Sequence, residues 1–207
     1  MRKQAMELSA GIPLGSLGLR ALLSSRLDGV AVVVRPDDPL NWLESIGMEA
    51  AAVAHGAGAA PRIVVCAEAE RGMAFSIRRG LEDVLEKRPE TEAVVIALAD
   101  QPFITADMID ELICRWREHP RLDYVATAGS DDGRGEPLLL PPALLNRSMF
   151  EALRQLEGDA GARGLFRSSR YRGRGLPAPS GKTLLDVDTL RQYDLACRLL
   201  LDETGLP

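Results

Sequence analysis

Short apolar runs alternate with longer amphipathic stretches along the first half of the chain. The apolar runs are rich in β-branched residues and carry almost no charge, as is typical of strands buried on both faces of a sheet. These predicted strands are 29–35, 62–67 and 93–100. The amphipathic stretches repeat apolar residues at helical spacing, and Thr105 is a favourable N-cap for the last of them. These predicted helices are 15–27, 41–48, 72–88 and 105–119.

The alternation of strands and helices predicts an α/β fold. Continuous apolar strands joined by helices indicate a mainly parallel sheet with helices on both faces, a Rossmann-like three-layer sandwich. The second half departs from this pattern, with strand-like runs at 123–129 and 136–142 around a Gly-rich turn. We expect it to form one wall of a cleft. Its remaining predicted elements are a helix near 143–156, a loop at 157–164, a short strand at 182–188 and a helix at 189–203.

No repeat, low-complexity segment or linker divides the sequence, so we expect one domain over residues 1–207. Its 25 basic and 30 acidic residues give a net charge of −5, and no basic stripe is available for nucleic-acid binding. The three cysteines, Cys66, Cys114 and Cys197, have the spacing of neither a zinc site nor a disulfide framework. With no secretory signal and no apolar run of membrane-spanning length, the sequence predicts a cytoplasmic protein.

Asp100 is the first candidate for a functional side chain. It ends the apolar run of "VVIALADQPFI", and ligands of α/β sheets bind at the carboxyl ends of the strands. A carboxylate there is a metal ligand or simply the residue that ends a strand, and the strand alone favours neither interpretation.

A second group of carboxylates occurs in "LLDVDTLRQYD". Asp186 and Asp188 lie two apart on the predicted strand, so their side chains share one face. Asp188 is either the N-cap of the final helix or a second oxygen ligand for Mg²⁺. Taken alone, the helix cap is the favoured interpretation.

Two Gly-rich segments, "GRGEP" and "EGDAGARG", allow the backbone to approach a ligand closely. In the second, Asp159 is either the N-cap of the helix that follows or part of a turn whose amides face an anionic substrate. The two interpretations stay open.

Taken together and in order, "ALADQPFIT", "GRGEPLLL", "LEGDAGARGLF" and "LLDVDT" resemble the MobA-like nucleotidyltransferases, which attach a nucleotide to molybdopterin. The resemblance is greatest to molybdenum cofactor cytidylyltransferases and to PucB-like purine catabolism proteins. "RGMAFSIRRGL" also matches a Gly-x-x-x-Ser-x-x-x-Gly helix start, here Gly72, Ser76 and Gly80. The resemblance covers about 3–193, and it implies the nucleotide-diphospho-sugar transferase-like version of the α/β fold.

The resemblance implies transfer of CMP from CTP, with GTP as the alternative donor, to molybdopterin. A sugar phosphate is a weaker acceptor, and a molybdenum hydroxylase such as xanthine dehydrogenase is a candidate recipient. Asp100 would be catalytic and hold Mg²⁺ with Asp188 as second ligand, and Lys3 would be both catalytic and nucleotide-binding. The other implied site residues are Gly72 and Ser76 for the nucleotide, and Gly135, Pro137, Gly158, Asp159 and Gly161 for the pterin phosphate.

The sequence departs from the family pattern at its start. Members begin with a strand and a Gly-rich triphosphate loop before a lysine, and Lys3 takes that lysine's position without either element before it. Either the start codon is placed too late, or the protein has lost its grip on the triphosphate and lacks a central strand, which would expose apolar neighbours. The second case predicts a non-catalytic protein that binds the cofactor or docks on a dehydrogenase.

Overall fold

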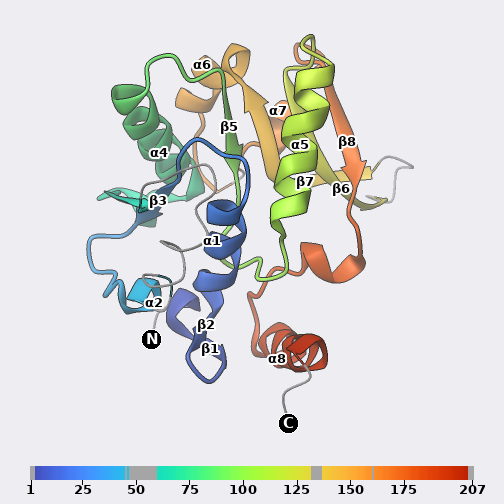
Figure 1. The fold of residues 1–207 in the computed structure, drawn as a ribbon. Coiled ribbons are helices and arrows are strands. Elements are labelled where there is room, and N and C mark those ends of the chain that lie inside the picture. The colour runs from blue at the N-terminus through green and yellow to red at the C-terminus, as the bar shows by residue number, and fades with distance from the viewer. Residues whose placement is uncertain (1–2, 45, 47–59, 132–136, 160, 205–207) are drawn as a thin grey trace.

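The structure, a computed structural model, describes residues 3–44, 46, 60–131, 137–159 and 161–204 (Figure 1). Its strands are β1 (Glu7–Ser9), β2 (Ile12–Pro13), β3 (Ala31–Val34), β4 (Arg62–Val65), β5 (Ala93–Ile96), β6 (Tyr124–Asp131), β7 (Pro137–Asn146) and β8 (Gly173–Pro177). Its α-helices are α1 (Leu14–Ser24), α2 (Asn41–Glu44), α4 (Met73–Lys87), α5 (Ala106–Glu118), α6 (Phe150–Arg154), α7 (Arg163–Phe166) and α8 (Leu190–Thr204). Short 3₁₀ helices are η1 (Lys3–Ala5), η2 (Ala69–Arg71), η3 (Arg147–Met149) and η4 (Gly181–Leu184).

Helices cover both faces of the sheet, which confirms the predicted α/β class and its three layers. On one face, Val95 of β5 packs with α1 and α5 in a cluster that includes Ile109 and Leu112. On the other face, Val94 and Ile96 pack with α4 and α6. Successive residues of a strand point to opposite faces, so one apolar strand supplies both cores.

The strand pairing combines parallel and antiparallel neighbours. β3 is parallel to β4, and β6 is parallel to β8. In the sheet of order β5-β7-β6-β8, β7 runs antiparallel to both of its neighbours. β7 follows β6 after a connection too short for the crossover that a parallel pair requires, so these two strands form a hairpin.

The predicted helix start at Thr105 is confirmed. Thr105 lies just before α5, and its hydroxyl oxygen accepts a hydrogen bond from the Met108 amide at 3.3 Å. This contact satisfies one of the free amides of the first turn.

Two predictions for the second half are wrong in part. The expected strand at 182–188 is the 3₁₀ helix η4 followed by unpaired residues, and the Val187 amide donates to the carbonyl of Asp100 at 3.0 Å. The partner of this amide is therefore a carbonyl in a turn, and not a carbonyl of a neighbouring strand. The helix expected near 143–156 is only η3 and α6, since Leu144 and its neighbours pair with both β5 and β6.

Within the described residues, no helix has both the length and the apolar character needed to cross a membrane.

Candidate active site

Asp100 lies in a turn at the carboxyl end of β5. The strand ends at Ile96, and the Asp100 side chain is 21% exposed. The backbone hydrogen bond from Val187 to the Asp100 carbonyl holds this turn against the segment that leads into α8. The turn therefore brings together two parts of the chain that the sequence separates by more than 80 residues.

Lys3 joins the two predicted metal ligands. Its ammonium nitrogen Nζ lies 2.7 Å from Asp100 Oδ2 and 2.7 Å from Asp188 Oδ1. Burial acts to lower the pKa of Lys3, but its hydrogen bonds to the two carboxylates outweigh this effect, so the pKa lies above its ordinary value. Three residues that the resemblance assigns to one site thus meet at one edge of the sheet.

Asp188 is not the cap of the final helix, which corrects the interpretation favoured from the sequence segment alone. Thr189 holds that position, because its hydroxyl oxygen accepts from the Gln192 amide at 3.3 Å. The Gln192 side-chain oxygen in turn accepts from the amides of Asp188 and Thr189. This reciprocal arrangement is a capping box. It leaves the Asp188 carboxylate directed at Lys3.

Asp186 and Gln101 belong to the same cluster, although neither was selected as a site residue. Burial raises the pKa of Asp186, and the negative charges of Asp100 and Asp188 raise it further, while Gln101 and Arg163 act in the opposite direction. Gln101 is 1% exposed. The only signals in the sequence were the spacing of Asp186 from Asp188 and the position of Gln101 next to Asp100.

Several polar atoms of this cluster lack hydrogen-bond partners among the described residues. They include Asp100 Oδ1 and Asp186 Oδ1, both of them buried. Buried polar atoms normally have partners, so these unpaired oxygens fit a bound cation or ordered water. Within the described chain, no group of three or more His, Cys, Asp or Glu side chains is arranged to hold a metal.

A second cluster forms where α4 begins. Gly72 has φ of +130° and immediately precedes the helix. A Cβ atom on Gly72 would lie 2.6 Å from the carbonyl oxygen of Gly158, so only glycine fits here. The Ala74 amide donates to that carbonyl at 3.0 Å, and the Met73 amide donates to Asp159 Oδ1 at 3.1 Å.

Asp159 therefore caps α4, a helix 86 residues earlier in the chain, and not the helix that follows it. Gly161 completes the turn with φ of +56°, where a Cβ would lie 3.0 Å from Met73 Sδ. Gly72, which the resemblance assigns to the nucleotide, thus contacts Gly158 and Asp159, which it assigns to the pterin phosphate, and Gly161 lies beside Met73.

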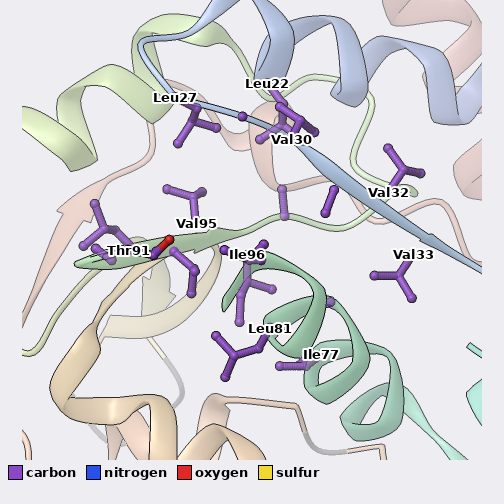
Figure 2. A pocket seen from close by; sticks show the side chains of 18 of the residues that line it. Leu22, Leu27, Val30, Val32, Val33, Ile77, Leu81, Thr91, Val95 and Ile96 are labelled. Atoms are coloured by element: carbon purple, nitrogen blue, oxygen red, sulfur yellow. The ribbon is translucent and has the colours of Figure 1, made fainter. Parts of the chain in front are cut away.

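Three further residues were predicted for the site: Ser76, Pro137 and Gly135. Ser76 follows in the first turn of α4 and lines a cavity of about 760 Å³. Residues of β3 and β5 also line this cavity (Figure 2). Pro137 begins β7 and is exposed, opposite Asp131 in the β6–β7 hairpin. Gly135 lies outside the described residues.

The model of the MobA-like NTP transferase domain matches residues 1–174 of this chain. The chain belongs to this family. A curated relative, the purine catabolism protein PucB of Bacillus subtilis (strain 168), is 30% identical over 194 residues, which are 92% of this chain and 85% of PucB.

Two solved structures share the fold. The molybdopterin-guanine dinucleotide biosynthesis protein A of Archaeoglobus fulgidus superposes with a TM-score of 0.61 at 15% identity, over 98% of this chain and 92% of that one. Rv0371C of Mycobacterium tuberculosis H37Rv, in a complex with manganese, gives a TM-score of 0.61 at 20% identity, over 90% and 87% of the two chains. The nucleotidyltransferase fold expected from the sequence is confirmed.

Proposed function

We propose that this protein is a Mg²⁺-dependent nucleotidyltransferase that transfers CMP from CTP to molybdopterin. The observation that carries the proposal is the meeting of Asp100, Asp188 and Lys3 at the carboxyl end of β5. Family membership and the name of PucB support a role in molybdenum cofactor maturation for purine catabolism. The product would pass to a molybdenum hydroxylase such as xanthine dehydrogenase, in the cytoplasm, and residues 1–207 would act as one domain.

Asp100 and Asp188 are the residues that would hold the metal ion. Mg²⁺ takes one or two carboxylates and completes its shell with phosphate oxygens and water, which fits a site with two converging aspartates. When bound, the ion would supply charge neutralisation to the phosphates of the nucleotide. The manganese complex of the structural relative Rv0371C supports divalent metal use in this fold.

Lys3 has two roles in this proposal. Its ammonium group lies between the two carboxylates that would hold the metal ion. If Asp100 and Asp188 held a cation, the cation would replace the ammonium group of Lys3, which could then neutralise charge on the triphosphate. Lysine suits this exchange because it is a compact charge on a flexible stem.

The chemical step needs little covalent work from the protein. A terminal phosphate oxygen of molybdopterin attacks the α-phosphorus of CTP, the bond to the β-phosphate oxygen breaks, and pyrophosphate leaves. Positioning and electrostatic stabilisation supply most of the rate in such transfers. Gly72 and Ser76 would lie beside the nucleotide base. The residues proposed for the pterin phosphate are Gly135, Pro137, Gly158, Asp159 and Gly161.

Titration calorimetry with CTP, GTP and ATP, each with and without MgCl₂, tests the proposal. We expect Mg²⁺-dependent binding with CTP tightest, and label transfer from [α-³²P]CTP to molybdopterin. Asp100→Asn should lower that transfer by about 100-fold or more, as loss of a transition-state electrostatic contact does, without unfolding the protein. Asp202→Asn, at an exposed position of α8, is the matched control.

Two outcomes would contradict the proposal. Full transfer activity in Asp100→Asn would remove Asp100 from the catalytic role. A folded protein that binds molybdopterin but no nucleotide would support the alternative, a non-catalytic protein that holds the cofactor or docks on a dehydrogenase.

A further inference from the structure

The helix α8 leaves more apolar surface exposed than any other element of the described chain. It lies at one end of the molecule, away from the four-stranded sheet (Figure 1), and its inward residues Ala196 and Leu200 pack in a core cluster with β1. Three of the six large apolar side chains that are exposed in the described residues belong to this one helix: Leu190, Leu195 and Leu201. Packing against its own chain therefore covers only part of the apolar surface of α8.

Two of these leucines lie on one side of the helix with a pair of opposite charges. The residues Leu190, Asp194, Arg198 and Leu201 follow one another at spacings of four, four and three, which places them along one face of a helix. We call these four residues the α8 stripe. All four are exposed, and Leu190 is 75% exposed. Leu195 is also exposed, but it lies about 120° around the helix from Leu201, at about 3.6 residues per turn.

The order of residues along the α8 stripe is complementary to its own reverse. In chain order the stripe is apolar, acidic, basic and apolar. When the order is reversed, each leucine lies opposite a leucine, and the acidic residue lies opposite the basic one. Arg198 Nε donates to the backbone carbonyl of Asp194 at 3.2 Å, which keeps the guanidinium group beside the stripe. The surface that best matches the α8 stripe is therefore a second α8 stripe that runs in the opposite direction.

We propose that the α8 stripe binds the same stripe of a second copy of this chain, with the two helices antiparallel. A two-fold axis at the middle of the pair places Leu190 opposite Leu201 of the second copy, and Asp194 opposite its Arg198. Each of these pairs occurs twice, because a two-fold contact uses the same surface on both copies. A parallel pair would instead place like charges opposite each other, and like charges at this distance repel.

The contact is apolar at its two ends and charged at its centre. Removal of the four leucine side chains from water supplies the driving force, and the ion pairs set the direction of the helices. One pair of 15-residue helices buries less surface than a standard protein interface, so we expect a monomer–dimer equilibrium with a micromolar Kd. The antiparallel arrangement places the C-terminal end of one helix beside the start of the other, two residues after Asp188. The proposal rests on the α8 stripe alone and is independent of the proposed function.

Sedimentation equilibrium of the full chain over a range of micromolar concentrations tests the proposal. Leu201→Glu should weaken the dimer by about tenfold or more, because it places two carboxylates in the apolar ends of the contact. Leu195→Glu is the matched control, since Leu195 is 40% exposed and Leu201 is 38% exposed on the same helix. We expect the control to dimerise as the wild type does. A wild type that is monomeric at every concentration would overturn the proposal, and so would a dimer that Leu195→Glu weakens and Leu201→Glu does not.

Exchange of the two charges tests the antiparallel direction without any change in the leucines. Asp194→Arg should weaken the dimer by about tenfold, because each introduced arginine lies opposite Arg198 of the second copy. The double variant Asp194→Arg/Arg198→Asp should restore the wild-type Kd, since opposite charges again face each other in an antiparallel pair. Recovery in the double variant also shows that the single variant did not act through loss of the fold. A dimer that is unchanged by Asp194→Arg, or that the second substitution fails to restore, would overturn the antiparallel assignment.

Discussion

At the scale of single residues, Lys3 connects the most distant parts of the site. Its side chain bonds to Asp100, 97 positions away, and to Asp188, 185 positions away. Both carboxylates are partly exposed, so this ion pair contributes modestly to stability. Its importance lies in occupying the place between two candidate metal ligands.

Lys3→Met should tighten binding of a divalent cation by about tenfold, since an ammonium group no longer competes for the two carboxylates. Mn²⁺ binding followed by electron paramagnetic resonance measures this without any turnover. Lys87→Met, in the last turn of α4, is the control for loss of one positive charge. Unchanged or weaker Mn²⁺ affinity in Lys3→Met would exclude competition between the Lys3 ammonium group and the cation.

Tyr124 provides a prediction remote from the Asp100 turn. Its hydroxyl donates to the Phe166 carbonyl at 2.9 Å, and its ring packs on Phe166 with centroids 4.7 Å apart. Burial raises the pKa of Tyr124 above its ordinary value of 10.0. The Tyr124 hydroxyl therefore ionises at a lower pH in the unfolded chain than in the folded protein. The free energy of unfolding falls as the pH rises through 10 and on through the higher pKa of the folded state.

Tyr124→Phe should cost about 1 kcal/mol at pH 7, because the Phe166 carbonyl loses its donor. The same variant should lose less stability than the wild type between about pH 10 and 11. Urea unfolding at both pH values measures the two effects, with the half-buried Tyr171→Phe as control. A drop at high pH as steep as that of the wild type would contradict the assignment to Tyr124.

At the scale of elements, the start of α4 depends on a turn from the second half of the chain. Asp159 and Gly158 accept the hydrogen bonds of its first amides. The contact fixes the helix that carries Ser76 against the turn proposed for the pterin phosphate. Substitutions at Asp159 and at Gly72 separate the stability that the hydrogen bond contributes from the stability that the close packing contributes.

Asp159→Ala should destabilise the protein by about 1 kcal/mol, the usual cost of a lost cap, and Asp159→Asn should retain most of that contact. Gly72→Ala should cost more, about 2–3 kcal/mol, because it combines a positive φ with a Cβ 2.6 Å from a carbonyl oxygen. Thermal unfolding ranks the three variants. A Gly72→Ala protein as stable as the wild type would show that the Gly72–Gly158 contact is absent.

The predictability of each element depended on its environment. β5 was recognised because a strand packed on both faces needs a continuous apolar run. β3 and β4 carry similar runs, although Ile63 and Val65 of β4 are exposed. β8, with the sequence Gly-Arg-Gly-Leu-Pro, has no such run and pairs with β6 along only one edge. The segment 182–188 has alternating apolar residues but no strand neighbour, and alternation alone cannot reveal that.

At the scale of the whole molecule, metal binding and folding should be linked. A ligand that binds only the native state stabilises it by ~2.7 kcal/mol when present at 100 times its Kd. For a chain of 207 residues, this corresponds to a Tm increase of about 5–10 °C.

We expect this increase with MnCl₂ and a much smaller one in Asp100→Asn. Differential scanning calorimetry of both proteins across a MnCl₂ series measures it, with KCl at matched ionic strength as the control for screening. Equal increases in the two proteins would place the metal away from Asp100.

The sequence by itself determined the α/β class, the strands 29–35, 62–67 and 93–100, and the helices between them, because apolar runs and apolar periodicity are local features of the chain. Its ordered motifs also pointed to the family. Only the tertiary structure decided that Lys3 lies between Asp100 and Asp188, that Asp159 caps α4, and that residues of β3 and β5 line one cavity. Each of these depends on a contact between residues far apart in the chain, and no local pattern carries that information.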